Sequence, residues 1–157
     1  MEIILDEDKY NDIWDKIFQD FLFSPSVYAE DPWLSFVTQS KKYRLNDLFS
    51  EEQEKIINSI FCRLHPKNMY ALDWHHDCFI YNPCEEIPLD YWFYDAERDC
   101  NVYFPSYYPN GDYHFFASFD WSIGLYGHPW KKEIIVVGEK LIQEFDKVQN
   151  ALYIAEL

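Results

Sequence analysis

From Met69 onward, short runs of aromatic and β-branched residues alternate with turn-forming residues, and this pattern limits the fold more than any other feature. Such runs predict strands of a largely antiparallel sheet. The predicted strands cover 69–74, 78–82, 102–106, 112–119 and 133–137. Asn110-Gly111 lies between two aromatic runs and predicts a hairpin that joins 102–107 to 112–119. The run Ile134–Val137 has no polar alternation, which predicts a central strand covered on both faces.

Helical periodicity marks three further segments. Trp14, Ile17 and Phe21 recur at helical spacing, and Ser50 followed by Gln53 is typical of a capping box at a helix start. The predicted helices cover 8–22, 51–64 and 139–149, whereas 24–48 is expected to be irregular. We therefore predict one α+β domain over residues 1–157, with a largely antiparallel sheet packed by about three helices. Its core is expected to include Trp14, Ile60, Ile135 and Val137.

Strong acidity excludes one class of partner. The chain has 28 Asp and Glu residues against 13 Lys and Arg residues, a formal net charge of −15 at pH 7. Such a chain repels nucleic acid phosphates, so we expect no direct nucleic acid ligand, but it attracts basic proteins. Residues 68–130 hold ten acids against Arg98 alone, together with 19 of the 32 aromatic residues. The alternative is that the charge only keeps an aromatic-rich protein soluble.

Acidic and aromatic side chains coincide in this middle segment, as they do in interfaces that combine ring anchors with a charged rim. The candidate partner-binding residues are Asp90, Tyr91, Trp92, Tyr94, Asp95, Asp99, Tyr107 and Tyr108. Our leading hypothesis is a non-enzymatic, acidic protein-binding module of the immunity or antitoxin type that neutralises a basic partner such as a toxin domain. It depends on charge, size and the absence of catalytic motifs.

A competing hypothesis is an enzyme, hydrolase-like or metal-dependent, that uses a His/Asp cluster. In an extended strand, Asp73, His75 and Asp77 share one face, while His76 points the other way. Two carboxylates beside an imidazole could bind a divalent metal or form an acid–base pair. The alternative is a solvated strand face, and a tight turn at His75-His76 would break the shared face.

Two loop residues extend the enzyme hypothesis. Asp112 follows Asn110-Gly111 and either caps that turn or joins the cluster. His128 lies between a glycine and a proline, which could present it rigidly, or it bonds a backbone carbonyl while Trp130 anchors the loop in the core. The candidate catalytic residues are Asp73, His75, His76, Asp112 and His128. Convergence of these side chains in an open cleft would favour the enzyme over the binding module.

No motif in the chain identifies a cofactor. The glycine-rich phosphate loop, the dinucleotide fingerprint, the nucleophile elbow and the H-E-x-x-H zinc helix are all missing from the sequence. We therefore expect no cofactor and no metal ion bound with high affinity.

The cysteines and the absence of targeting segments indicate a compartment. The sequence has no signal peptide and no run long enough to span a membrane, so we expect no membrane partner. Cys62, Cys78, Cys84 and Cys100 lack the C-x-x-C spacing of zinc and redox sites. We predict free, mostly buried thiols in a cytoplasmic protein.

Two blocks of the sequence are similar to a known family. The first runs from Leu72-Asp73-Trp74-His75-His76 to Asn82-Pro83. The second runs from Tyr108-Pro109-Asn110-Gly111-Asp112-Tyr113 to Gly127-His128-Pro129-Trp130 and Ile134–Gly138. Together they resemble a bacterial family catalogued as domain of unknown function 2716. The resemblance implies a bacterial origin and an α+β fold, and it implies no activity because none is established for the family.

Overall fold

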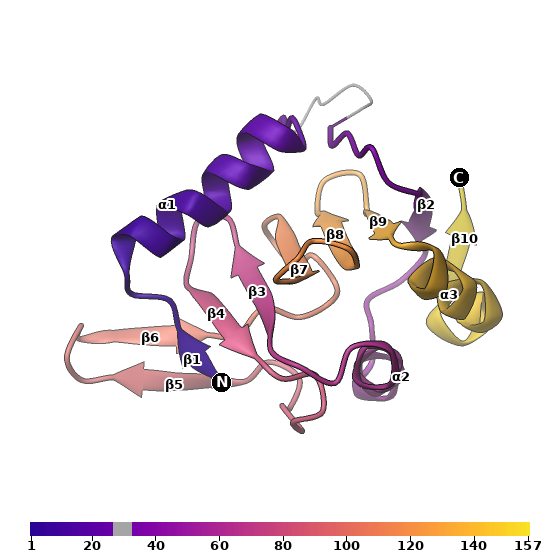
Figure 1. Ribbon diagram of the computed structural model, residues 1–157. Helices are drawn as coiled ribbons and strands as arrows, with labels where there is room; N and C mark the ends of the chain where they lie inside the picture. The colour runs from indigo at the N-terminus through magenta and orange to yellow at the C-terminus, as the bar shows by residue number, and fades with distance from the viewer. Residues whose placement is uncertain (27–32) are drawn as a thin grey trace.

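The structure of the chain is a computed structural model that describes residues 1–26 and 33–157 and has three layers (Figure 1). An eight-stranded antiparallel sheet lies in the middle, and helix α1 (Glu7–Asp15) packs on one of its faces. Helices α2 (Glu51–Leu64) and α3 (Glu139–Leu152) pack on the other face. The predicted α+β class is confirmed.

The strands of the main sheet lie in the order β1-β4-β3-β7-β8-β9-β2-β10. Their bounds are β1 (Glu2–Ile3), β2 (Ser40–Leu45), β3 (Met69–Asp73), β4 (Cys78–Tyr81), β7 (His114–Ser118), β8 (Gly124–His128), β9 (Glu133–Val137) and β10 (Ile154–Glu156). A separate two-stranded ribbon consists of β5 (Trp92–Asp95) and β6 (Cys100–Tyr103). The two strands of each pair run antiparallel, and short connections join β3 to β4, β5 to β6, β7 to β8 and β8 to β9.

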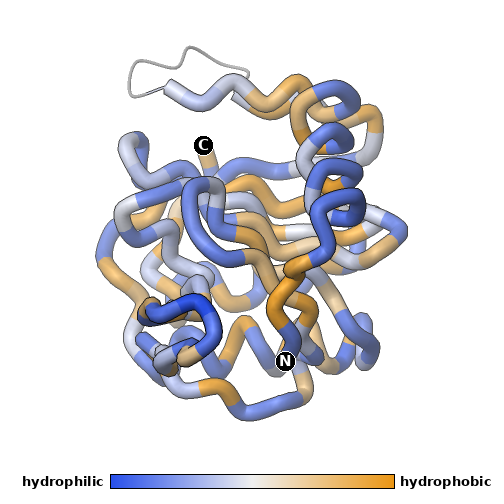
Figure 2. Tube along the Cα trace, turned by 90° about the vertical axis from the view of Figure 1, so that its left-hand side faces the viewer, coloured by the Kyte–Doolittle hydropathy of each residue, from blue (hydrophilic) through white to orange (hydrophobic). Residues whose placement is uncertain are grey.

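The strand β9 confirms the prediction of a central strand covered on both faces. It lies between β8 and β2, and its residues from Ile134 to Val137 are all buried. Ile134 and Val136 pack toward α2 and α3, whereas Ile135 and Val137 pack toward α1. Figure 2 shows hydrophobic residues gathered in the central strands and hydrophilic residues in the surrounding loops. The core is therefore two apolar layers separated by one sheet.

The predicted helices are present with small changes in their bounds. Helix α1 begins after Asp6, whose side chain accepts a hydrogen bond from the Lys9 backbone N–H, and continues as a π-helix (η1, Lys16–Asp20). At the start of α2 the Ser50 N–H donates to Gln53 Oε1 over 2.7 Å, and the Gln53 N–H donates to Ser50 Oγ over 3.3 Å. This capping box confirms the predicted helix start. Trp14 and Ile60 are buried, as expected.

The predicted hairpin between 102–107 and 112–119 is wrong. Strand β6 pairs with β5, and β7 pairs with β3 and β8 instead. Pro105 and Pro109 interrupt the intervening segment, and a proline has no N–H to donate to a strand partner. Gly111 still makes a turn, with φ of +86°, so the turn signal was correct but its two strands were not.

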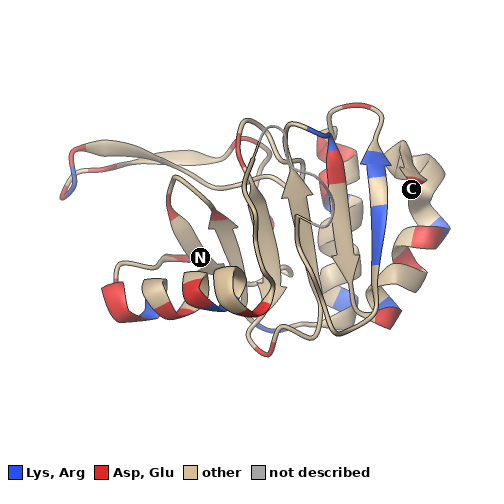
Figure 3. Ribbon diagram, turned by 90° about the horizontal axis from the view of Figure 1, so that it is seen from above, with Lys and Arg blue, Asp and Glu red and all other residues tan. Residues whose placement is uncertain are grey.

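A strand lies where the sequence predicted irregular structure over 24–48. Strand β2 pairs with both β9 and β10, and its Tyr43 and Leu45 are buried. Its basic side chains, which form the blue strand in Figure 3, are balanced by acids of neighbouring elements: Lys41 Nζ lies 2.8 Å from both Asp146 and Glu156. These long-range ion pairs are invisible to local sequence patterns, which is why the strand was not predicted.

The cysteine prediction is wrong for two of the four residues. Cys62, near the end of α2, and Cys84, in the loop after β4, form a disulfide with a Cα–Cα distance of 4.9 Å. Cys78 and Cys100 have free thiols. Cys78 is buried, and burial raises its pKa to about 12, so it is an inert thiol as expected. Within residues 1–26 and 33–157, no helix has the length and apolarity needed to cross a membrane.

Candidate functional site

The candidate site forms where the end of β3 meets the start of β7. Antiparallel pairing places Asp73, the last residue of β3, opposite His114, the first residue of β7. The turn that follows β3 carries His75 and His76, and Asp112 shortly precedes β7. Four of the five candidate catalytic residues therefore converge at this end of the sheet.

Two imidazoles and two carboxylates face each other in this cluster. His76 Nδ1 lies 2.8 Å from Asp73 Oδ1, and His75 Nδ1 lies 2.6 Å from Asp112 Oδ2. His76 Nδ1 is also 4.0 Å from Asp112 Oδ2, which links the two pairs. The first two contacts have hydrogen-bond length, as acid–base catalysis requires.

The shared strand face predicted for Asp73, His75 and Asp77 does not form. The strand ends at Asp73, and a turn in which the His76 N–H donates to the Asp73 carbonyl over 3.3 Å redirects the chain. Asp77 instead binds Arg98, with Oδ1 2.6 Å from Nη1. The turn thus brings His76, and not Asp77, beside Asp73.

Asp112 does more than cap its turn. Its side chain is buried, and Oδ1 accepts a 2.7 Å hydrogen bond from the Tyr113 backbone N–H. This bond leaves Oδ2 directed at the histidines. The backbone therefore fixes the carboxylate in the orientation that the cluster needs.

His114 completes the cluster, and sequence reasoning missed it. It is buried, its Nδ1 lies 2.9 Å from the Ser106 carbonyl, and its Nε2 lies 3.4 Å from Asp73 Oδ2. Because a carbonyl only accepts, Nδ1 donates to it, and Nε2 faces the Asp73 carboxylate. The signal was available: Asp112 and His114 are two residues apart at the start of a strand.

The protonation of the first pair follows from these contacts. Burial alone would raise the pKa of Asp73, but hydrogen bonds and charge from His114 and His76 outweigh burial and hold that pKa below its usual value. The hydrogen bond to Asp73 in turn raises the pKa of His76. The arrangement favours a carboxylate and an imidazolium in contact.

A pocket of about 560 Å³ opens beside the cluster. Asp73, His76 and His114 of the cluster line it, and so do Trp92 and Tyr103 of the ribbon; we call these two sets of residues its two walls. Its volume suits a small ligand or the end of a long side chain. The pocket therefore combines ionisable groups with an aromatic wall.

The ribbon presents a continuous aromatic face. Trp92, Tyr94 and Tyr103 are exposed by 54%, 56% and 56%, and Trp92 and Tyr103 are cross-strand partners. Alternate residues such as Val102 face the core. Figure 3 shows the ribbon projecting beyond the main sheet.

The predicted partner-binding residues separate into two groups. Asp90 and Asp99 are exposed, and Tyr91 is half-buried beside them in the ribbon region. Asp95 is engaged by Arg98, whose Nε lies 2.7 Å from Asp95 Oδ2. Together with Trp92 and Tyr94, these residues form the first group, which lies on or near the ribbon.

The other two predicted residues lie away from the ribbon face. Tyr107 lies in the core, where its hydroxyl donates to Asn58 Oδ1 over 2.5 Å, and it is not accessible to a partner. Tyr108 is half-buried against Phe49. The aromatic run suggested a binding surface, but the rings of Tyr107 and Tyr108 pack against other residues of the domain instead.

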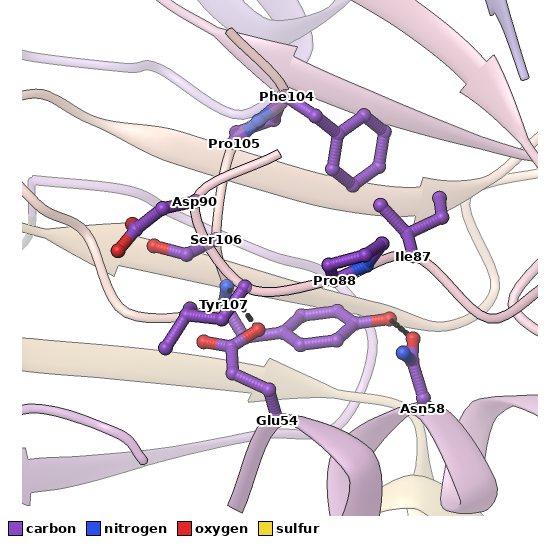
Figure 4. A pocket seen from close by; sticks show the side chains of 10 residues that line it. Glu54, Asn58, Ile87, Pro88, Asp90, Phe104, Pro105, Ser106 and Tyr107 are labelled. Atoms are coloured by element: carbon purple, nitrogen blue, oxygen red, sulfur yellow. Dashed lines mark hydrogen bonds between the residues drawn. The ribbon is translucent and has the colours of Figure 1, made fainter. Parts of the chain in front are cut away.

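A second, smaller cavity lies around Glu54 of α2 (Figure 4) and shares Phe104 and Ser106 with the lining of the pocket. Glu54 Oε2 accepts from the Tyr107 N–H over 3.1 Å, and Oε1 accepts from the Tyr108 N–H over 3.3 Å. Burial nevertheless raises the pKa of Glu54 to about 7. The cavity measures about 20 Å³, room for one water molecule, so it is not a ligand site.

His128 lies apart from the cluster. It is buried on the α1 side of the sheet, with its ring 4.9 Å from those of Trp33 and Tyr113. Its Nδ1 accepts a hydrogen bond from the Lys131 N–H over 3.3 Å. Trp130 is 54% exposed and does not anchor the loop in the core, contrary to expectation.

Comparison with known proteins identifies a family and a relative. The sequence pattern of the family described as "Protein of unknown function (DUF2716)" matches residues 4–142. The chain is also similar to the uncharacterized protein YxiI of Bacillus subtilis (strain 168), with 32% identity over 161 aligned positions. That alignment covers 95% of this chain and 94% of the relative. No solved structure matches the chain.

Proposed function

The chain belongs to the DUF2716 family of proteins of unknown function, and we propose that it is an acidic, non-enzymatic protein-binding module of the immunity or antitoxin type. The observation that carries the proposal is the exposed aromatic face of the ribbon, formed by Trp92, Tyr94 and Tyr103. Large rings exposed together are typical of binding surfaces, because burying them in a complex releases water from a large apolar area.

Charge favours a basic partner for this face. The ribbon lies in the segment 68–130, which carries a net charge of −9, from ten acids and Arg98. Asp90 and Asp99 are exposed near the rings, and Asp73 lies in the adjoining pocket. We propose that a Lys or Arg side chain of the partner packs on the Trp92 ring and pairs with these carboxylates, so that cation–π attraction and charge pairing act together.

The experiment compares two tryptophans of equal exposure. Trp92 and Trp130 are both 54% exposed, but Trp130 lies away from the ribbon. We expect a basic protein from the native host to bind the wild type, with an association rate that falls as salt rises from about 50 to about 500 mM. Trp92→Ala should weaken binding by about 30-fold through the dissociation rate. Trp130→Ala should leave binding unchanged.

The proposal has clear contrary outcomes. Binding that is indifferent to salt and to Trp92→Ala would show that the acidity and the aromatic face serve another purpose. A partner that binds Trp130→Ala as weakly as Trp92→Ala would move the interface away from the ribbon. Either result would remove the support for an immunity-type role.

The enzyme hypothesis remains the second candidate, and one observation favours it. Asp73, His75, His76 and Asp112 converge beside an open pocket, the arrangement that acid–base or metal-assisted hydrolysis requires. The two candidates separate in a hydrolysis screen with chromogenic phosphate and carboxylate esters. Turnover that His76→Ala abolishes and Trp92→Ala preserves would place the enzyme ahead of the binding module.

The cytoplasmic location also remains a proposal. Acidity and both candidate functions are compatible with it, but the disulfide between Cys62 and Cys84 counts against a strongly reducing compartment. Counting free thiols in protein purified under alkylating conditions from the native host decides the matter. Four alkylated cysteines would support the cytoplasm, and two would not.

A further inference from the structure

We propose that Asp73, His76 and Asp112 form a binding site for one divalent transition-metal ion, Zn²⁺ or Mn²⁺, beside the pocket. The sequence alone predicted no such ion, because it could not show these residues together. The proposal goes beyond the partner-binding role and does not depend on it, since the site uses the cluster and not the ribbon face.

The ligand atoms are already gathered. One imidazole nitrogen and two carboxylate oxygens from these residues all lie within 4.8 Å of one another. Ligands around a tetrahedral ion at about 2.1 Å are roughly 3.4 Å apart, so small side-chain rotations suffice. A nitrogen and oxygen donor set of this kind suits Zn²⁺ and Mn²⁺.

A second set of contacts holds the two carboxylates. His114 Nε2 lies 3.4 Å from Asp73 Oδ2, and His114 is itself held by the Ser106 carbonyl. His75 Nδ1 lies 2.6 Å from Asp112 Oδ2. Metal-binding carboxylates in proteins are commonly oriented by such hydrogen-bonded partners. These supporting contacts distinguish the cluster from a chance group of surface acids.

Charge also fits a divalent cation. Asp73 and Asp112 are both buried, and a buried pair of carboxylates needs a compensating positive charge. A divalent ion supplies two positive charges to these two carboxylates.

The position of the site leaves one side of the ion accessible. The His76 side chain is 63% exposed and lines the pocket together with Asp73. Three protein ligands with an open fourth position are typical of zinc sites that bind an exogenous ligand. A donor group that enters past Trp92 and Tyr103 could therefore reach the ion.

The test is calorimetric titration of the full chain with Zn²⁺ and, separately, Mn²⁺. We expect one ion per chain in the micromolar range or tighter for the wild type. His76→Ala, a change at an exposed side chain, should abolish binding, and His75→Ala should weaken it by about 10-fold or more. His65→Ala, which removes a histidine outside the cluster, should bind as the wild type does.

A second measurement locates the bound ion. Bound Mn²⁺ broadens nearby NMR resonances, so the ring signals of His76 should disappear while those of His65 persist. Mn²⁺ avoids thiols, which separates the cluster from zinc captured by Cys100. Absence of one-to-one binding for both ions, or His76→Ala binding equal to the wild type, would overturn the proposal. Trp92→Ala, which should weaken partner binding, should leave ion binding intact. The ion site and the partner-binding role can therefore fail independently of each other.

Discussion

The two walls of the pocket differ in how their side chains are held. In the cluster, Asp73 and Asp112 are buried and each contacts an imidazole and the surrounding structure. On the ribbon, Trp92 and Tyr103 are exposed and contact mainly each other, with ring centroids 6.2 Å apart. The cluster is organised before any ligand arrives, whereas the ribbon offers apolar area that only a partner could bury.

This difference indicates different ligands for the two walls. Preorganised charged groups bind small ions or polar groups well, because little reorganisation is needed. Exposed rings on a projecting ribbon gain most from a macromolecular surface. One pocket can therefore serve an ion on one side and a protein side chain on the other.

The largest expected effect on stability comes from removing the disulfide between Cys62 and Cys84, next to the segment that leads into the ribbon. Cys84 belongs to the loop that leads from β4 into the ribbon, and Cys62 ties this loop to α2. Closing a loop over a sequence separation of 22 stabilises a protein by about 3 kcal/mol, chiefly through the unfolded state. We expect the double variant Cys62→Ser/Cys84→Ser to lose about that much unfolding free energy in urea.

The same variant tests whether the two walls are independent. Its metal binding should stay close to that of the wild type, because the cluster is fixed by β3 and β7. The control is Cys100→Ser, which removes a half-buried thiol that forms no disulfide. A double variant as stable as the wild type would mean that the disulfide adds nothing in solution.

The comparison also shows what the sequence could predict. The core strands β3, β7 and β9 have apolar runs, and their positions were predicted because burial on both faces leaves a local signature. The segment 102–106 was predicted as a strand and overlaps β6, but its pairing with β5 was not predicted, because alternation tells which way a side chain points but not which strand lies beside it. Pro105 and Pro109 separate β6 from β7, and these two strands pair with different partners instead of with each other.

The candidate site was half predictable for a related reason. Asp73, His75, His76 and Asp112 were named from residue type and spacing, and they do converge. Their grouping depends on the pairing of β3 with β7 and on a turn at His75-His76, which are long-range and conformational facts. His114 was missed because a histidine within an apolar strand is usually assigned to the core.

A smaller effect on stability is expected from the ionisation of Glu54. This residue binds the segment that joins the ribbon to β7. Its carboxylate accepts the backbone N–H groups of Tyr107 and Tyr108, between the ribbon and β7. The folded pKa is about 7, above the usual value of 4.5. Between these values the folded state holds a proton that the unfolded state lacks, so stability should fall as pH rises from about 4.5 to about 7.

The size of this effect on the unfolding free energy follows from the shift in the Glu54 pKa from 4.5 to about 7. This pKa shift corresponds to at most about 3 kcal/mol of unfolding free energy, and because Glu54 is partly exposed we expect about 2 kcal/mol. Glu54→Gln cannot ionise, so its unfolding free energy should depend less on pH between about 5 and 8. Glu52→Gln, at an exposed position of the same helix, is the control. Equal pH profiles for Glu54→Gln and the wild type would contradict the assignment.

The smallest effect, and the sharpest test of the comparison, concerns Arg98, which joins the two regions. Its guanidinium contacts Asp95 of the ribbon at 2.7 Å and Asp77, next to the His75-His76 turn, at 2.6 Å. Because both pairs are near the surface, Arg98→Ala should hardly change global stability. It should instead loosen the ribbon, so that amide hydrogen exchange in β5 and β6 becomes a few-fold faster while exchange in β3 and β7 stays the same. Lys147→Ala, which removes a surface ion pair of α3, should change neither. If Arg98→Ala also weakens ion binding as strongly as His75→Ala, the cluster and the ribbon form one cooperative unit, and the division between a rigid ion site and an adaptable partner surface would have to be abandoned.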